Sequence, residues 1–253
     1  MSDPHTLVAH AKLTRSLRIT GVRADGYHLI DAEMVSLDLH DLLTIDPSGT
    51  GLAATGPFAD GVPLDGHNLV AKALVLVGRE ARVVVDKQIP HGGGLGGGST
   101  DAAAILRWAR VGVDADALDC AAGLGADIPF CLVGGRAHVS GIGELIHDLP
   151  FMPLAFTLVI PPLTVSTPAA YRAWDDLGGP TADGPNDLEP AALVVEPGLR
   201  WWRDAIAERV GGAPTLAGSG ATWFTEGEHS DALVDLIEEG ATVVGAHAVP
   251  RID

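Results

Sequence analysis

The residues best suited to chemistry are glycines gathered in one short segment. Six of the seven residues from Gly92 to Gly98 are glycine, and the exception is Leu95. Because glycines lack Cβ atoms, such a segment lets several backbone N–H groups close around an anion. We expect Ser99 or Thr100 to cap the apolar helix that follows, whose positive end would face the same anion. The segment therefore predicts a phosphate-binding loop. A flexible linker is the alternative, and the position between a Val-rich strand and a helix disfavours it.

Two named nucleotide motifs do not explain the glycine segment. A Walker A loop ends in Gly-Lys-Ser/Thr, whereas here Ser99 follows Gly98 directly. Three of the glycines match the Rossmann spacing, and Asp114 falls about twenty residues further on, as that fingerprint requires. However, Asp114 follows a predicted helix rather than a strand, and Pro90 interrupts the junction between strand and loop. Dinucleotide binding is therefore the minor interpretation.

Two charged residues elsewhere in the sequence are further candidates for chemistry. Lys12 lies on the polar face of a predicted strand, and Asp127 immediately precedes a short predicted helix with proline in its first turn. Taken alone, a solvated lysine and a helix-capping aspartate are the ordinary interpretations. The 10 histidines show no metal-binding spacing and no Gly-x-Ser-x-Gly motif is present, so we predict no metal-ligating residues.

The spacing of apolar residues predicts the elements that must position these groups. Strands are expected at 9–20, 30–39, 81–86 and 156–160. Helices are expected at 68–78, 99–111, 115–124, 168–177, 199–210 and 230–239. Because strands and helices mix without strict βαβ alternation, the predicted class is α+β rather than a doubly wound sheet. The pattern of predicted strands and helices changes after Pro150, and this change predicts two domains, residues 1–152 and 153–253.

Composition excludes several classes of partner. The 253 residues include 33 Asp and Glu against 16 Lys and Arg, a net charge of −17, which would repel a nucleic-acid backbone. No apolar run approaches the about 18–20 residues of a membrane span, and no signal peptide is visible. Cys120 and Cys131 form neither a metal motif nor a disulfide framework, which favours the cytoplasm. A small-molecule partner remains, and monomer and homodimer stay open.

Several motifs, taken in order along the chain, resemble those of the GHMP small-molecule kinases. They are Ala11-Lys12-Leu13, Asp25-Gly26-Tyr27-His28, Asn68-Leu69, Asp86-Lys87, the segment 89–103, Gly125-Ala126-Asp127-Ile128-Pro129-Phe130, Val165-Ser166-Thr167-Pro168, Asn186-Asp187-Leu188-Glu189-Pro190 and Gly218-Ser219-Gly220-Ala221-Thr222. The glycine segment alone would indicate only the superfamily. The motifs beginning at Asp25 and Asn186 are narrower, and they are similar to those of the 4-diphosphocytidyl-2-C-methyl-D-erythritol kinases of isoprenoid biosynthesis.

The resemblance implies a fold and a reaction. The fold would be the two-domain α+β GHMP kinase fold, with an N-terminal nucleotide-binding domain like ribosomal protein S5 and a ferredoxin-like C-terminal domain. ATP, with Mg²⁺, would phosphorylate the 2-hydroxyl of 4-(cytidine 5'-diphospho)-2-C-methyl-D-erythritol in a cleft between the domains.

The resemblance also implies roles for particular residues. Asp127 would be the general base, and Lys12 would hold its ionised carboxylate and the acceptor oxygen. Tyr27 and Tyr171 would stack on the cytosine while His28 reads its edge. The residues expected to bind ATP, with Asn68 and Lys87 near the adenine, are Asn68, Lys87, Pro90, Gly92, Gly93, Gly94, Leu95, Gly96, Gly97, Gly98, Ser99 and Thr100. Those expected to bind the acceptor are Thr14, Tyr27, His28, Tyr171, Gly218 and Ser219.

Two departures from the family keep alternatives open. Thr14 stands where these kinases usually carry Asn, and the C-terminal end from 242 to 253 lacks the usual closing pattern. One alternative is another GHMP kinase, acting on mevalonate, homoserine or a sugar. The motif from Asp25 to His28 argues against it, because those acceptors have no base on which Tyr27 could stack. The other alternative is a non-catalytic nucleotide-binding paralogue, which would not need both Lys12 and Asp127.

Overall fold

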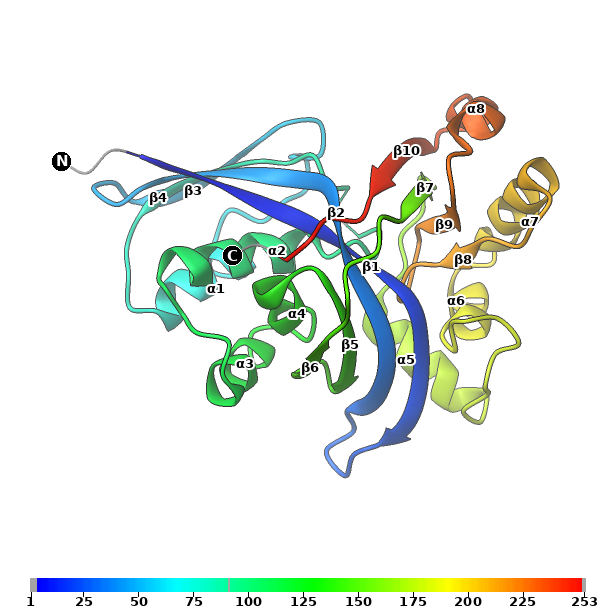
Figure 1. Ribbon diagram of the computed structural model, residues 1–253, viewed down its shortest axis with the longest axis horizontal. Helices are drawn as coiled ribbons and strands as arrows, with labels where there is room; N and C mark the ends of the chain where they lie inside the picture. The colour runs from blue at the N-terminus through cyan, green and yellow to red at the C-terminus, as the bar shows by residue number, and fades with distance from the viewer. Residues whose placement is uncertain (1–3, 91, 252–253) are drawn as a thin grey trace.

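The computed structural model describes residues 4–90 and 92–251 and contains two β-sheets with helices packed around them (Figure 1). Within the described residues, one sheet has six strands and the other has four. Every strand pair is antiparallel except β3–β4. The predicted α+β class is therefore confirmed. No helix among the described residues is long and apolar enough to cross a membrane.

A long bent hairpin organises the first sheet (Figure 1). Its strands, β1 (His5–Val22) and β2 (His28–Asp46), extend the two predicted strands at both ends. They meet at a turn in which Gly26 has φ of 87°, a conformation that favours glycine. The remaining strands are β3 (Gly51–Thr55), β4 (Arg82–Asp86), β5 (Arg136–Gly141) and β6 (Leu145–Asp148), in the order β3-β4-β2-β5-β6 with β1 on β2.

Four helices pack together with this sheet. They are α1 (Leu69–Leu76), α2 (Gly97–Trp108), α3 (Ala115–Ala122) and α4 (Ile128–Val133). Helix α2 is the central one, because Ala102, Ala103, Ala104, Ile105 and Leu106 are all fully buried. The small side chains of the three alanines let α2 approach β1 and β2 closely, and this places the glycine segment at the N-terminus of α2 beside β1.

The second sheet has the order β10-β7-β9-β8. Its strands are β7 (Ala155–Ile160), β8 (Thr215–Leu216), β9 (Trp223–Glu226) and β10 (Thr242–His247). Its helices are α5 (Thr167–Asp176), α6 (Glu189–Val195), α7 (Leu199–Val210) and α8 (Ser230–Leu233), with a 3₁₀ turn η1 (Val234–Ile237). The helix predicted at 230–239 was wrong in part, because it tightens into this 3₁₀ turn and ends at Ile237.

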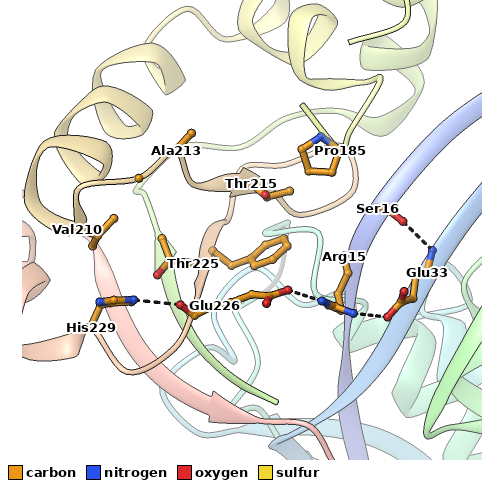
Figure 2. A pocket seen from close by; sticks show the side chains of 12 residues that line it. Arg15, Ser16, Glu33, Pro185, Val210, Ala213, Thr215, Thr225, Glu226 and His229 are labelled. Carbon is orange, nitrogen blue, oxygen red and sulfur yellow. Dashed lines mark hydrogen bonds and ion pairs between the residues drawn. The ribbon is translucent and has the colours of Figure 1, made fainter. Parts of the chain in front are cut away.

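The two sheets are joined by a shared apolar cluster and by Arg15. The cluster combines Leu13, Leu37 and Leu95 with Phe156 and Phe224. Arg15 forms ion pairs with Glu33 on β2 and with Glu226 on β9, beside a cavity of about 490 Å³ (Figure 2). Strand β6 ends at Asp148 and β7 begins at Ala155. The domain division at residue 152 stays a prediction.

Candidate active site

The glycine segment leads directly into α2, which begins at Gly97. Gly96 precedes the helix in the left-handed conformation, with φ of 72°, and supplies no side-chain cap. The predicted cap at Ser99 or Thr100 was wrong, because the glycines let the helix begin earlier and place both residues in its first turn. The Thr100 hydroxyl instead donates to the His10 carbonyl at 2.7 Å. The first N–H groups of α2 have no partner inside the helix, which leaves them suited to an anion.

Close approaches explain why two loop positions must be glycine. A Cβ atom on Gly94 would lie 2.4 Å from the Ala217 carbonyl oxygen, and one on Gly96 would lie 2.7 Å from Cγ of Lys12. The Lys12 backbone N–H also donates to the Leu95 carbonyl at 3.0 Å. The loop is therefore held between β1 and the turn that begins at Ala217 and contains Gly218 and Gly220, directly beside the Lys12 side chain.

Lys12 and Asp127 form an ion pair, with 3.2 Å between Nζ and Oδ2. The Lys12 side chain is only 5% exposed, so it is not the solvated lysine of the ordinary interpretation. Asp127 does precede α4, but its side chain makes no capping hydrogen bond, and 34% of it remains exposed. The Lys12 ammonium also donates to the Thr14 hydroxyl at 3.1 Å. A buried ammonium thus holds a partly accessible carboxylate.

A cavity of about 540 Å³ connects this pair to the glycine segment and to the hairpin turn. Every residue predicted to bind the acceptor lines it, together with Gly94 and Ser99 from the loop: Lys12, Thr14, Tyr27, His28, Gly94, Ser99, Asp127, Tyr171, Gly218 and Ser219. Sequence reasoning missed Met34, Ala126, Ile142, Arg172, Asp175 and Leu188, which also line it. The cavity therefore draws on both sheets and on α5.

An aromatic cluster on α5 and at His28 borders this cavity. The His28 ring lies on Tyr171, with 4.6 Å between centroids and a tilt of 33°, and meets Trp174 edge-on at 5.6 Å. Its Nε2 lies 2.8 Å from Oδ1 of Asp175. Tyr27 is 57% exposed beside the turn, so His28 rather than Tyr27 contacts the Tyr171 ring. Burial raises the pKa of Tyr171 and keeps its hydroxyl neutral.

A helical spacing signal could have identified the two residues of this cluster that sequence reasoning missed. Trp174 and Asp175 stand three and four positions after Tyr171 on α5, and such residues share one face of a helix.

A buried asparagine positions the Gly218 turn. The Asn186 amide donates to the carbonyls of Leu216 and Gly218, at 2.8 and 2.6 Å. The neighbouring Asp187 carboxylate accepts from the Ile19 backbone N–H at 3.0 Å. The motif beginning at Asn186, to which sequence analysis gave no role, thus ties the turn and β1 together. The turn also contacts the start of α5, because the hydroxyl oxygens of Thr167 and Ser219 are 2.8 Å apart.

The two side chains predicted to lie near the adenine are bonded within the protein. Asn68 caps α1, accepting from the Val70 backbone N–H at 2.8 Å and donating to the Pro63 carbonyl at 2.7 Å. The Lys87 ammonium pairs with Asp41 and, at 2.7 Å, with Asp101, and its side chain is 3% exposed. These bonds give both side chains a role in positioning α1 and α2, and their place near the adenine stays a prediction.

The ion pairs of Lys87 with Asp41 and Asp101 also anchor the glycine segment. Asp41 on β2 accepts from the backbone N–H groups of Gln88 and Ile89, at 2.6 and 2.8 Å. Lys87 lies between the end of β4 and the glycine segment, and its partners Asp41 and Asp101 belong to β2 and to α2. The two ion pairs therefore link β2, the chain that enters the segment and the helix that follows it. Pro90, also predicted to bind ATP, is buried at this junction.

Comparison with known proteins gives the following similarities. The family model described as the GHMP kinases N-terminal domain matches residues 68–135. A protein named 4-diphosphocytidyl-2-C-methyl-D-erythritol kinase from Paracoccus denitrificans (strain Pd 1222) is 39% identical over 239 residues, covering 85% of this chain and 84% of that protein. One of the same name from Granulibacter bethesdensis is 35% identical over 270 residues, covering 93% of this chain and 89% of that protein.

Solved structures agree with these relatives. A crystal structure of 4-(cytidine 5'-diphospho)-2C-methyl-D-erythritol kinase superposes with a TM-score of 0.75 at 29% identity, covering 97% of this chain and 100% of that chain. The homoserine kinase of Cytophaga hutchinsonii superposes with a TM-score of 0.67 at 18% identity, covering 99% and 96%. At that identity the second likeness supports the fold alone.

Proposed function

The chain belongs to the 4-diphosphocytidyl-2-C-methyl-D-erythritol kinases of the GHMP family, and on that premise we propose the reaction it catalyses. It transfers the γ-phosphoryl group of ATP to the 2-hydroxyl of 4-(cytidine 5'-diphospho)-2-C-methyl-D-erythritol, a step of isoprenoid biosynthesis. The observation that carries the proposal is the Lys12–Asp127 ion pair inside a cavity that reaches from the glycine segment to the aromatic cluster.

The ion pair supports the roles of general base and positioning cation. Asp127 accepts the proton of the acceptor hydroxyl, the resulting oxygen attacks the γ-phosphorus, and the bond from that phosphorus to the β-phosphate oxygen breaks to release ADP. The Lys12 ammonium holds the Asp127 carboxylate in place before transfer and stabilises negative charge on the attacking oxygen. Because Lys12 is buried, its ammonium is held in place rather than dispersed in solvent.

The phosphates of ATP are assigned to the glycine segment and the first turn of α2. That site needs few basic side chains, because backbone N–H groups and the helix dipole supply the positive charge. No group of three or more His, Cys, Asp or Glu side chains within the described residues could hold a metal ion. We therefore expect Mg²⁺ to be held mainly by phosphate oxygens and water, where it neutralises phosphate charge.

The cytosine is assigned to the aromatic end of the cavity. The exposed Tyr27 ring and the Tyr171–His28 pair offer π-faces and polar edges there. Stacking supplies binding energy that any base could gain, so polar atoms at the edges must select the base. Gly218 and Ser219 border the acceptor next to Lys12, where a Cβ atom on Gly218 would lie 3.6 Å from the Lys12 Nζ.

An acceptor panel tests the proposal. The purified chain is incubated with ATP and Mg²⁺ in separate reactions, each containing one acceptor: the cytidylated acceptor, mevalonate, homoserine or galactose. ADP release gives the rate, and ³¹P spectra show whether a new phosphate monoester has formed. We expect turnover with the cytidylated acceptor alone. Phosphorylation of another acceptor in its place would contradict the assignment, and ATP binding without any turnover would favour the non-catalytic alternative.

We also propose that the enzyme works in the cytoplasm as a monomer or a homodimer. Cys120 and Cys131 are free thiols, as expected in a reducing compartment. Cell fractionation tests the location, and sedimentation velocity tests the assembly state.

A further inference from the structure

We propose that Asp175 is a positioning residue that makes the site select cytosine over uracil by fixing the tautomer of His28. The inference rests on the proposed function, because it concerns how the acceptor's base is read. Asp175 lines the cavity beside His28 and was not among the residues predicted from the sequence.

The contact between the two side chains determines where the imidazole proton resides. Nε2 of His28 lies 2.8 Å from Oδ1 of Asp175. An ionised carboxylate can only accept a hydrogen bond, so the nitrogen that faces it must carry the proton. In the neutral imidazole the other nitrogen, Nδ1, is then a bare acceptor. Nδ1 makes no hydrogen bond to any described residue, which leaves it available to a ligand in the cavity.

Packing keeps the His28 ring from turning away from this arrangement. Its side chain is 10% exposed, with Tyr171 against its face and Trp174 meeting it edge-on. Both aromatic residues come from α5, the helix that also carries Asp175. One helix therefore fixes both the plane of the imidazole and the position of its proton.

An acceptor nitrogen at this position distinguishes the two pyrimidines. Cytosine presents a 4-amino group, which donates to Nδ1, whereas uracil presents a 4-oxo group, whose lone pairs would face those of Nδ1. A site built to pair with a donor rejects a ligand that lacks it, because the protein atom is left unsatisfied. We expect discrimination of about 10- to 100-fold from one such contact.

The His28–Asp175 pair is suited to mutation because it contributes little to the free energy of unfolding. Asp175 is 48% exposed, and ion pairs with so exposed a partner stabilise proteins weakly. Asp175→Ala is therefore expected to fold and to release the histidine to both tautomers. Asp176→Ala is the matched control, since it removes the neighbouring carboxylate at the end of the same helix, where the residue is exposed and lies outside the cavity lining.

The test measures binding of cytidine 5'-diphosphate and uridine 5'-diphosphate by calorimetry, together with ¹⁵N shifts of the His28 imidazole. Wild type and Asp176→Ala should prefer the cytidine ligand by about 10-fold or more and show the Nε2–H tautomer. Asp175→Ala should lose most of that preference and show mixed tautomers. An unchanged preference, or an unchanged tautomer, in Asp175→Ala would overturn the inference.

Turnover separates this inference from the proposed function. If wild type phosphorylates the cytidylated acceptor and Asp175→Ala keeps its base preference, only the role of Asp175 fails. If wild type phosphorylates neither the cytidylated nor a uridylated acceptor, the proposed reaction fails. The calorimetric preference and the imidazole shifts then still decide whether Asp175 controls base selection.

Discussion

Lys12 and Asp127, which the sequence places on β1 and just before α4, meet with 3.2 Å between the ammonium nitrogen and a carboxylate oxygen. Only the lysine of the pair is buried, so the carboxylate keeps an accessible edge toward the cavity. A carboxylate placed only to cap α4 would instead point at the helix N–H groups, and Asp127 makes no such bond. This arrangement is the one expected of a proton acceptor held by a cation.

Replacement of Asp127 by Asn tests its role as the base. The amide fills the same volume but cannot accept the hydroxyl proton, so we expect kcat to fall by about 10²- to 10⁴-fold. ATP affinity, measured by calorimetry, should change little, because we assign the phosphates to the glycine segment rather than to Asp127. Asp119→Asn, at an exposed position on α3, is the control and should keep the wild-type rate. Wild-type turnover by the Asp127 variant would remove the base from the mechanism.

Replacement of Gly94 by Ala tests the close approach of the loop to the Gly218 turn. The new Cβ would lie 2.4 Å from the Ala217 carbonyl oxygen, at a residue whose φ is 80°. We expect a loss of about 1–3 kcal/mol in the free energy of unfolding and a raised KM for ATP. Gly212→Ala is the control, since a Cβ there meets nothing within 4 Å. Equal stability of the two variants in urea titrations would show that the loop can shift without strain.

The buried Asp101 makes stability depend on pH near neutrality. Burial raises the pKa of Asp101 from 3.8 to about 7, against the attraction of Lys87. The folded state therefore holds this proton more tightly than the unfolded state, so the contribution of Asp101 to stability is full below 3.8 and is lost as pH rises through about 7.

Asp101→Asn isolates this effect. We expect the free energy of unfolding of wild type to lose this contribution between about pH 5 and about pH 8, and the amide variant to lack that dependence. Urea titrations at the two pH values measure it. Asp116→Asn, at an exposed position on α3, should behave as wild type. The same pH slope in Asp101→Asn and wild type would show that other groups cause it.

Glu33 is expected to give stability a second pH dependence, because its partner Arg15 joins the two sheets. Burial acts to raise the pKa of Glu33, but hydrogen bonds from Arg136 and Arg15 outweigh it and leave the pKa below its ordinary value of 4.5. The contribution is therefore present above 4.5 and is lost as pH falls through the lowered pKa. Figure 2 shows Arg15 between Glu33 and Glu226, so protonation of Glu33 weakens one side of this link.

Glu33→Gln should reduce the loss of stability in acid. Thermal unfolding at about pH 7 and about pH 4 measures the difference in Tm for each protein. We expect a smaller difference in Glu33→Gln than in wild type, and a wild-type difference in the exposed control Glu80→Gln. If Glu33→Gln lost as much Tm as wild type, the acid sensitivity would arise elsewhere.

Local patterns explain which elements could be predicted. The helix at 199–210 was predicted with its bounds, and those at 68–78 and 168–177 to within two residues, because helical spacing is a property of neighbouring residues. Strands such as β8, with two residues, and β9, with four, carry too few residues to show alternation. They exist because β9 pairs with β7 and β8 pairs in turn with β9, and no local pattern reveals those partners.

The sequence by itself determined the chemical groups of the site. Side-chain type and short spacing fix the glycine segment, the charges of Lys12 and Asp127, and the aromatic residues near Asp25 and on α5. Those properties need no knowledge of distant contacts, and they were enough to indicate the kinase family.

Tertiary structure alone decided how those groups are used. It buried Lys87 between two carboxylates, and it paired Asp175 with His28. It also turned the Asp127 carboxylate toward Lys12 instead of toward its own helix. Such contacts join segments far apart in the chain, so they depend on how the sheets and helices pack together, and sequence spacing cannot report them.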